Sequence, residues 1–168
     1  GGGDEAGTAL TTGDNNVAVG YEALKTEDAH GRNIAIGFQA LKTQDAGANA
    51  FNTAVGYKAG TVITTGIKNI LVGGNAGLAL TDADFNVGVG HSALATDTQG
   101  SKSTAIGFQS LTTQNFSTAT DSHNTAVGYN ALTACTSGGA NTAVGTQCAD
   151  AVTSGDDNTA MGNLALSA

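Results

Sequence analysis

Proline and tryptophan are absent from the 168 residues, and other bulky side chains are scarce, with one methionine, three tyrosines and five phenylalanines. Glycine, by contrast, occurs 25 times. Protein interiors are densely packed and tolerate few voids, so a chain with so few large apolar groups can close only a thin core. Because no proline interrupts pairing, strands can stack without a break. The composition therefore favours a thin, β-rich architecture over an ordinary globular core.

Positive charge is also scarce, with six Lys and Arg against 14 Asp and Glu and a formal net charge of −8. Binding to a phosphate backbone needs clustered cations, so neither nucleic acid nor an anionic membrane surface is an expected partner. No run of 18 apolar residues is present, so we expect no membrane insertion. The first residues do not resemble a signal peptide. Two cysteines, Cys135 and Cys148, are too few for a disulfide framework.

A repeat with a 17-residue period runs through the chain, with nine segments of the type N-x-A-V-G-Y-x-A-L aligned on one glycine. We call each unit a rung and its aligned residue the anchor glycine. Six of the eight intervals between anchor glycines share this period, while those that end at Gly56 and Gly128 are slightly longer. Such self-similarity is typical of solenoids, so we predict a single repeat domain over residues 1–168. The nine anchor glycines are Gly20, Gly37, Gly56, Gly73, Gly90, Gly107, Gly128, Gly145 and Gly162.

Three columns precede each anchor glycine. The residue directly before the anchor glycine is a large aliphatic one, and the residue three positions before it is β-branched. The residue between these two is mostly alanine. Side chains alternate along a strand with period two, so the two larger columns share one face. We expect that face to be the core and the small column to face outward, where another surface approaches closely. The larger columns are Val17, Ile34, Thr53, Ile70, Val87, Thr104, Thr125, Thr142 and Thr159, and Val19, Ile36, Val55, Val72, Val89, Ile106, Val127, Val144 and Met161.

The anchor glycine turns the chain, because glycine alone reaches positive φ without penalty. We expect a second short extended piece after it, carrying an alanine and then a leucine such as Ala23 and Leu24. Two strands and two turns in each repeat make one coil of a parallel β-solenoid, whereas a βαβ unit needs about 30 residues. Nine rungs about 4.8 Å apart give a shaft of roughly 40 Å. Each rung is stabilised chiefly by stacking on its neighbours.

An asparagine stands four residues before eight of the nine anchor glycines, and Ser103 replaces it in the other rung. Stacked asparagines hydrogen-bond along a solenoid axis and tolerate the left-handed conformation at a corner. We interpret this column as structural rather than as a row of ligands. Its members are Asn16, Asn33, Asn52, Asn69, Asn86, Asn124, Asn141 and Asn158.

These motifs resemble the repeats of phage tail fibres, which often precede a self-cleaving intramolecular chaperone domain, and are similar to the head repeats of YadA-like trimeric autotransporter adhesins. The resemblance covers residues 16–166. It implies left-handed coiling and a homotrimer packed around one axis. It also implies other fibre segments or a C-terminal chaperone domain as neighbours at the ends. The repeat is longer than that of YadA-like heads, so tail fibres are the better match. No catalytic residue is carried over.

Candidate chemistry is sparse. His30, His91 and His123 lie at different phases of the repeat, and acidic turns such as 82–84 match no calcium loop, so we predict neither metal nor cofactor. No nucleophile motif is present, so no catalytic residue is predicted.

Phe116, in the longest interval between anchor glycines, is a weak candidate for receptor binding. We expect Cys148 to be buried and reduced, and Cys135 to lie in the surface arc.

A ring column follows the anchor glycines, and its regularity suits packing better than sugar recognition. It consists of Tyr21, Phe38, Tyr57, Phe108 and Tyr129, with His91 in the same position.

The function predicted from these features is that of a structural segment rather than an enzyme. We expect a trimeric extracellular fibre, namely a phage tail-fibre shaft on the virion that supports attachment to a host polysaccharide or protein receptor. A bacterial cell-surface adhesin head is the first alternative. The second alternative belongs to a different class of function, namely ice binding. Thr53, Thr104, Thr125, Thr142 and Thr159 form the partial threonine ladder that this function needs, although on our assignment the ladder faces inward. A polysaccharide-cleaving fibre is the third alternative.

Overall fold

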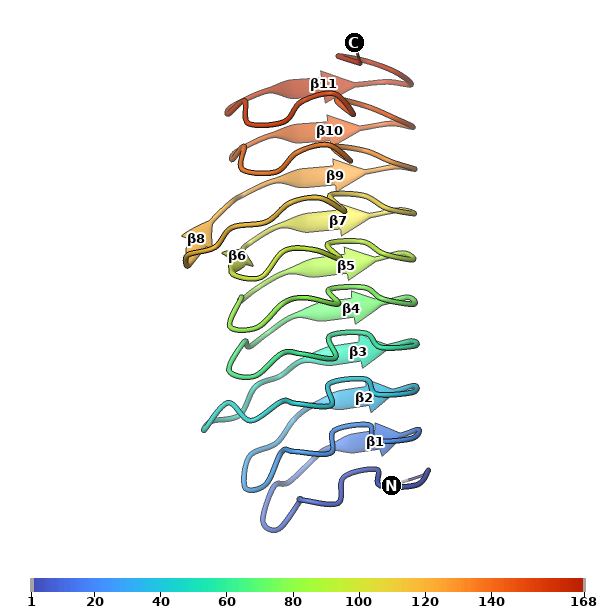
Figure 1. The fold of residues 1–168 in the computed structure, drawn as a ribbon, viewed down its shortest axis with the longest axis vertical. Helices are drawn as coiled ribbons and strands as arrows, with labels where there is room; N and C mark the ends of the chain where they lie inside the picture. Colours follow the sequence, from blue (N-terminus) through green and yellow to red (C-terminus); the bar gives the residue numbers. More distant parts are fainter. Residues whose placement is uncertain (1, 168) are drawn as a thin grey trace.

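The computed structural model describes residues 2–167 as a single stack of rungs along one axis (Figure 1). One short strand from each rung joins a nine-stranded parallel sheet in the order β1-β2-β3-β4-β5-β7-β9-β10-β11. These strands are β1 (Val17–Val19), β2 (Ile34–Ile36), β3 (Thr53–Val55), β4 (Ile70–Val72), β5 (Val87–Val89), β7 (Thr104–Ile106), β9 (Thr125–Val127), β10 (Thr142–Val144) and β11 (Thr159–Met161).

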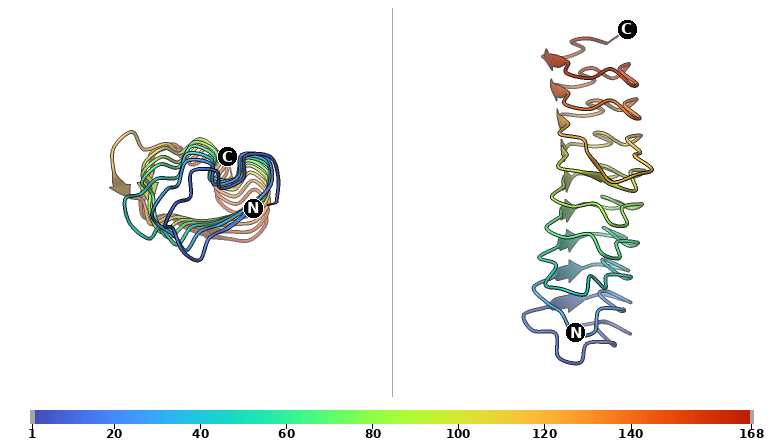
Figure 2. Two further views of the ribbon diagram at one scale, coloured as in Figure 1. Left: turned by 90° about the horizontal axis from the view of Figure 1, so that it is seen from below. Right: turned by 90° about the vertical axis from the view of Figure 1, so that its left-hand side faces the viewer.

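The register of this sheet follows the repeat. Val17 pairs with Ile34, and each later strand continues the same alignment across both longer intervals. The predicted parallel β-solenoid with 17-residue coils is therefore confirmed. The longer intervals project as loops from the same side of the stack (Figure 2). Two further strands, β6 (Gly100–Ser101) and β8 (Thr120–Asp121), pair at the base of the second loop. No helix occurs within residues 2–167.

The strands face the opposite way from our expectation. In the nine-stranded sheet the central residue of each strand is buried, and the residues on either side are half-buried or exposed. The central residue is alanine in seven strands, Leu71 in β4 and Gly88 in β5. Val19 is 44% exposed, whereas Ala35 is wholly buried. A coil this short is so narrow that its two walls nearly touch. Alanine fits that space and a β-branched side chain does not.

The segment after the anchor glycine is a tight turn, so the second extended piece was wrongly predicted. In the first rung Glu22 and Leu24 both have left-handed backbone, with φ of 52° and 49°, and the same two positions are left-handed in every later rung. Each non-glycine residue there costs about 1–2 kcal/mol of backbone strain. Hydrogen bonds along the axis hold the conformation: the Gln39 N–H, for example, donates to the Tyr21 carbonyl at 2.8 Å.

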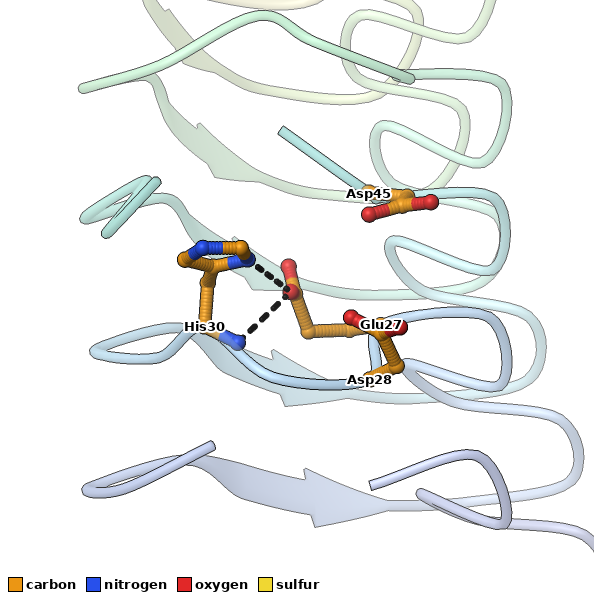
Figure 3. A group of neighbouring side chains, drawn as sticks. All are labelled: Glu27, Asp28, His30 and Asp45. Carbon is orange, nitrogen blue, oxygen red and sulfur yellow. Dashed lines mark hydrogen bonds and ion pairs between the residues drawn. The ribbon is translucent and has the colours of Figure 1, made fainter. Parts of the chain in front are cut away.

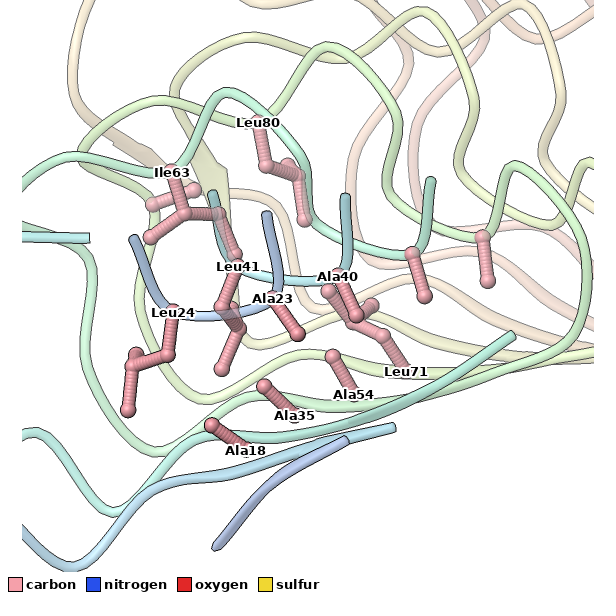
Figure 4. Close-up of a cluster of buried hydrophobic side chains, with 13 residues drawn as sticks. Ala18, Ala23, Leu24, Ala35, Ala40, Leu41, Ala54, Ile63, Leu71 and Leu80 are labelled. Carbon is pink, nitrogen blue, oxygen red and sulfur yellow. The ribbon is translucent and has the colours of Figure 1, made fainter. Parts of the chain in front are cut away.

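The core lies between the strands and this turn. Ala23 and Leu24 are wholly buried, as are their equivalents Ala40 and Leu41, and they point toward the alanines of the strands (Figure 4). Leu71 replaces the strand alanine in β4. The turn leucine is replaced by glycine in that rung and in the rung before it. A Cβ on either Gly60 or Gly77 would lie 2.9 or 2.8 Å from a methyl group of Leu71. The same two Cβ atoms would lie 2.9 Å from Ile63 and 2.8 Å from Leu80. Together with Ile63 and Leu80, Leu71 therefore fills the space that two turn leucines leave.

A third buried column was not predicted. It holds the seventh residue after each of the first eight anchor glycines, and its members are chemically mixed: Glu27, Gln44, Ile63, Leu80, Asp97, Gln114, Cys135 and, partly buried, Val152. Cys135 was expected at the surface but is wholly buried, because this column closes one end of the core. Cys148 is buried as predicted, and both thiols are free. Burial raises the pKa of the Cys135 thiol.

A partial rung precedes the nine predicted ones. Gly3 stands one repeat before Gly20 and has the same unusual backbone, with φ of 140°. Gly2 forms a parallel bridge with Val19, and Leu10 packs against the N-terminal end of the core. The spacing was visible in the sequence, but the strand columns that identify a rung are missing before Gly3.

Candidate functional site

No pocket is present over residues 2–167, so the candidate site is a surface. The two larger columns of the strands form a continuous outer face along the whole sheet, which we call the strand face. It contains only Val, Ile, Thr and Met side chains. Eight spacings between nine strands make it about 40 Å long. Contiguous exposed apolar surface of this kind marks an interaction site in most proteins.

The ring column continues this apolar surface around the corner made by the anchor glycines. Its rings stack along the axis in two groups: Tyr21–Phe38–Tyr57 and His91–Phe108–Tyr129, with centroids 5.3–5.6 Å apart. Gly74 supplies no ring between the groups. The rings cover one another's faces, as expected for packing, but remain partly exposed, with Tyr57 at 53%. Because their edges face outward, the column offers an apolar rim rather than open ring faces.

The asparagine column forms the predicted ladder inside the solenoid. The Oδ1 atom of Asn52 accepts the backbone N–H of Asn69 at 2.8 Å, and its Nδ2 atom donates to the carbonyl of Gly66 at 2.7 Å. Equivalent bonds join Asn16 to Asn33, Asn69 to Asn86, and Asn124 to Asn141 to Asn158. Buried polar groups are costly unless they are paired, and these side chains are paired in each rung.

Phe116 is not displayed as we expected. Its ring is half-buried, packed over Gly100, and its backbone N–H donates to the buried carboxylate of Asp97 at 3.0 Å. The exposed part of this loop is Ser117–Ala119, which offers little side-chain chemistry. The threonine ladder, by contrast, faces outward on the strand face, so the inward assignment was wrong.

A basic and aromatic column lies at the corner that precedes the strands. Arg32, Phe51, Lys68, Phe85 and Lys102 follow one another in successive rungs, all with left-handed backbone. The Arg32 guanidinium lies over the Phe51 ring at 5.3 Å, and the Lys68 ammonium lies over Phe85 at 4.9 Å. Three of the six cations of the chain gather here, and the two rings are already covered by cations. Exposed pairs of this type contribute about 0.5–1 kcal/mol.

A group of ion pairs, which we call the ionic clasp, joins the partial rung to the first two of the nine rungs. The Glu22 carboxylate accepts Lys25 at 2.7 Å, Lys42 at 2.6 Å and the Gln39 amide at 2.7 Å, and Lys25 also reaches Glu5 at 2.5 Å. The hydrogen bond from Lys25 contributes most, and those from Lys42 and Gln39 add to it, in lowering the pKa of Glu22 from 4.5 to about 2.

The clasp predicts a pH dependence of stability. A lowered folded-state pKa contributes stability that is fully present above pH 4.5 and is lost as the pH falls toward 2. Wild type should therefore melt at a higher temperature than Glu22→Gln at pH 6, and the difference should close by about pH 2. Thermal melts of both proteins across this range test it, with Asp150→Asn as a control acid outside the clasp. A difference that stays constant with pH would contradict the assignment.

Four possible metal ligands lie together near the same end of the stack. Glu27, Asp28, His30 and Asp45 each present one ligand atom, and these atoms all lie within 4.8 Å of one another (Figure 3). Glu27 is wholly buried, and burial is the main cause that raises the pKa of its carboxyl group. Sequence reasoning missed this cluster because it compared the histidines only with one another. Glu27, Asp28 and His30 lie within four residues, and Asp45 holds the position of Asp28 in the next rung.

Comparison of the chain with family models, with curated proteins and with solved structures found no match. Within residues 2–167 there is also no helix that is long and apolar enough to cross a membrane. The function therefore has to be argued from the surfaces themselves.

Proposed function

We propose that this chain is a structural segment of a homotrimeric extracellular fibre, a phage tail-fibre shaft that supports attachment to a host receptor. The observation that carries the proposal is the strand face, which is about 40 Å long and whose column next to the anchor glycines is aliphatic in all nine strands of the sheet. A single copy would leave it in water, and covering it along its whole length requires a partner with the same repeat. A second copy of this chain meets that requirement.

Two apolar surfaces on each copy favour three-fold over two-fold assembly. A two-fold dimer uses one self-complementary patch, whereas a closed ring joins two different patches of neighbouring copies. The strand face and the ring column meet at the anchor glycines, so one can pack on the other around a central axis. Such packing would bury the exposed ring edges of Tyr57 and Tyr129, which are 53% and 50% exposed. The resemblance to tail fibres and YadA-like heads supports the same arrangement, including left-handed coiling.

The oligomeric state tests this proposal. Light scattering on a sizing column should give three times 16.4 kDa, and the trimer should resist gentle heating in detergent. A double variant, Ile36→Asp and Val55→Asp, places two charges on the strand face and should yield folded monomers. The matched control is Ala48→Asp, which adds a charge to the exposed loop before β3 and should remain trimeric. A wild-type monomer, or a double variant that stays trimeric, would contradict the proposal.

Ice binding is a second candidate, which one observation favours. Thr104, Thr125, Thr142 and Thr159 stand directly beside one another in four successive parallel strands and face outward. A trimer would bury this ladder, so the two functions exclude each other on this face. A stable monomer that shows thermal hysteresis in dilute solution would favour ice binding, and a trimer without hysteresis would remove it.

A further inference from the structure

The buried column seven residues after the anchor glycine holds two carboxylates, and only one of them is well satisfied. Asp97 accepts the Gly100 and Phe116 N–H groups, each at 3.0 Å, and the Gln114 amide at 2.5 Å. Two hydrogen bonds of ordinary length and one short hydrogen bond satisfy this buried charge. Asp97 therefore shows what the position requires when it carries an acid.

Glu27 occupies the equivalent position without this support. Its carboxylate accepts the His30 N–H at 3.2 Å and is approached by the Asn33 amide at only 3.5 Å. Gln44, which corresponds to Gln114, instead donates to the Thr64 carbonyl at 3.0 Å. A wholly buried carboxylate with two long contacts is costly, since burying a charge demands close partners.

The neighbouring column adds two more carboxylates. Asp28 and Asp45 hold the eighth position after their anchor glycines and stack in successive rungs, and both are exposed. The later residues of this column are neutral: Thr64, Thr81, Thr98, Asn115, Thr136 and Thr153. Like charges on adjacent parallel strands or turns repel each other unless a cation lies between them. The two acids are thus placed together in the one rung pair where Glu27 also needs a cation.

The imidazole of His30 completes the group. Its Nδ1 atom is buried and has no hydrogen-bond partner, and it lies 3.8 Å from the Oε1 atom of Glu27, too far for a hydrogen bond. Figure 3 shows the ring and the Glu27 carboxylate turned toward each other, with Asp45 on the next rung. We propose that Glu27, Asp28, His30 and Asp45 form a divalent transition-metal site that ties two successive rungs together.

The donor set indicates which metals fit. One imidazole nitrogen with three carboxylate oxygens suits borderline ions such as Zn²⁺, whereas Ca²⁺ takes oxygen ligands alone. A bound dication would neutralise the buried Glu27 charge and the repulsion between Asp28 and Asp45. The site is independent of the proposed fibre function, because none of its residues lies on the strand face or in the ring column.

Calorimetric titration of tag-free protein with ZnCl₂ tests the site. Wild type should bind one Zn²⁺ per chain, and the melting temperature should rise with Zn²⁺ concentration because binding favours the folded state. His30→Ala and Asp45→Asn remove exposed or partly exposed ligands, so both variants should fold, and each should weaken affinity at least about tenfold. Glu27→Gln should also abolish tight binding while raising the melting temperature of the metal-free protein.

The control variant is Asp150→Asn, which removes an acid at the far end of the stack and should leave affinity unchanged. Three results would overturn the proposal: no saturable binding of Zn²⁺, equal affinity in wild type and in His30→Ala, or binding of Ca²⁺ as tight as that of Zn²⁺. The last outcome would mean that the carboxylates act only as a diffuse acidic surface.

Discussion

Gly90→Ala should unfold the middle of the solenoid, with a loss of more than about 4 kcal/mol in the free energy of unfolding. A Cβ on Gly90 would lie 2.5 Å from the carbonyl carbon of Gly107 in the next rung, and φ at Gly90 is 138°, a conformation that other residues rarely adopt. The neighbouring atoms are backbone, so neither rung can move aside without breaking the pairing of β5 with β7. Urea unfolding followed by circular dichroism measures the effect.

Gly47→Ala is the matched control for this substitution. Gly47 also has positive φ, at 66°, but a Cβ there would meet no atom within 4 Å. The free energy of unfolding should fall by only about 1 kcal/mol, the cost of placing alanine in a left-handed backbone conformation. If the two variants lost equal stability, the close approach of successive rungs would not be the reason for glycine at the anchor.

Leu71→Ala should cost about 2–5 kcal/mol, the range for removing a buried leucine that leaves a cavity. Leu71 is wholly buried in β4, and the glycines at 60 and 77 leave no turn leucine to fill the space. Val62→Ala removes an exposed side chain of similar type and should change stability by no more than about 0.5 kcal/mol. Chemical denaturation of the two variants compares them directly.

A compensating substitution makes this prediction sharper. Adding Gly77→Leu to Leu71→Ala moves the leucine from the strand to the turn, as in most other rungs, and requires only the flexible Leu80 side chain, 2.8 Å from a Cβ at position 77, to move aside. Leucine already adopts the left-handed backbone at this position, for example at Leu24. The double variant should regain much of the lost stability, whereas Gly77→Leu alone should overpack the core. No recovery in the double variant would show that the strand and turn columns do not share one space.

This exchange between Leu71 and the two glycines was present in the sequence and would have given the correct orientation of the strands. The repeat, the strand positions and their register follow from the sequence, because coils aligned on their anchor glycines bring equivalent residues side by side, and the two longer intervals place their extra residues in loops. The size of the apolar side chains does not show which face of the strands points inward, because the interior of this narrow coil admits alanine and excludes side chains such as Val19 and Ile36. A large residue appearing in the small column where the turn leucine disappears is the signal that these two columns face each other.

The candidate metal site was harder to foresee. Its ligands come from the seventh, eighth and tenth positions after an anchor glycine, and those positions carry different chemistry in other rungs. The seventh position alone ranges from Glu27 to Leu80 and Cys135, so no residue type identifies it as buried. Only the closed coil shows that Glu27 is buried, that Asp45 stacks above Asp28, and that the His30 ring turns toward the Glu27 carboxylate.

The backbone hydrogen bonds of the sheet all run along the long axis, which determines how one chain responds to tension. A chain pulled by its two ends loads these bonds in series, so it should open by peeling terminal rungs one at a time. Each event frees one rung and lengthens the chain by about 50 Å. A single chain is therefore expected to yield at a nearly constant, low force. In the proposed fibre, resistance to axial load would come from contacts between chains.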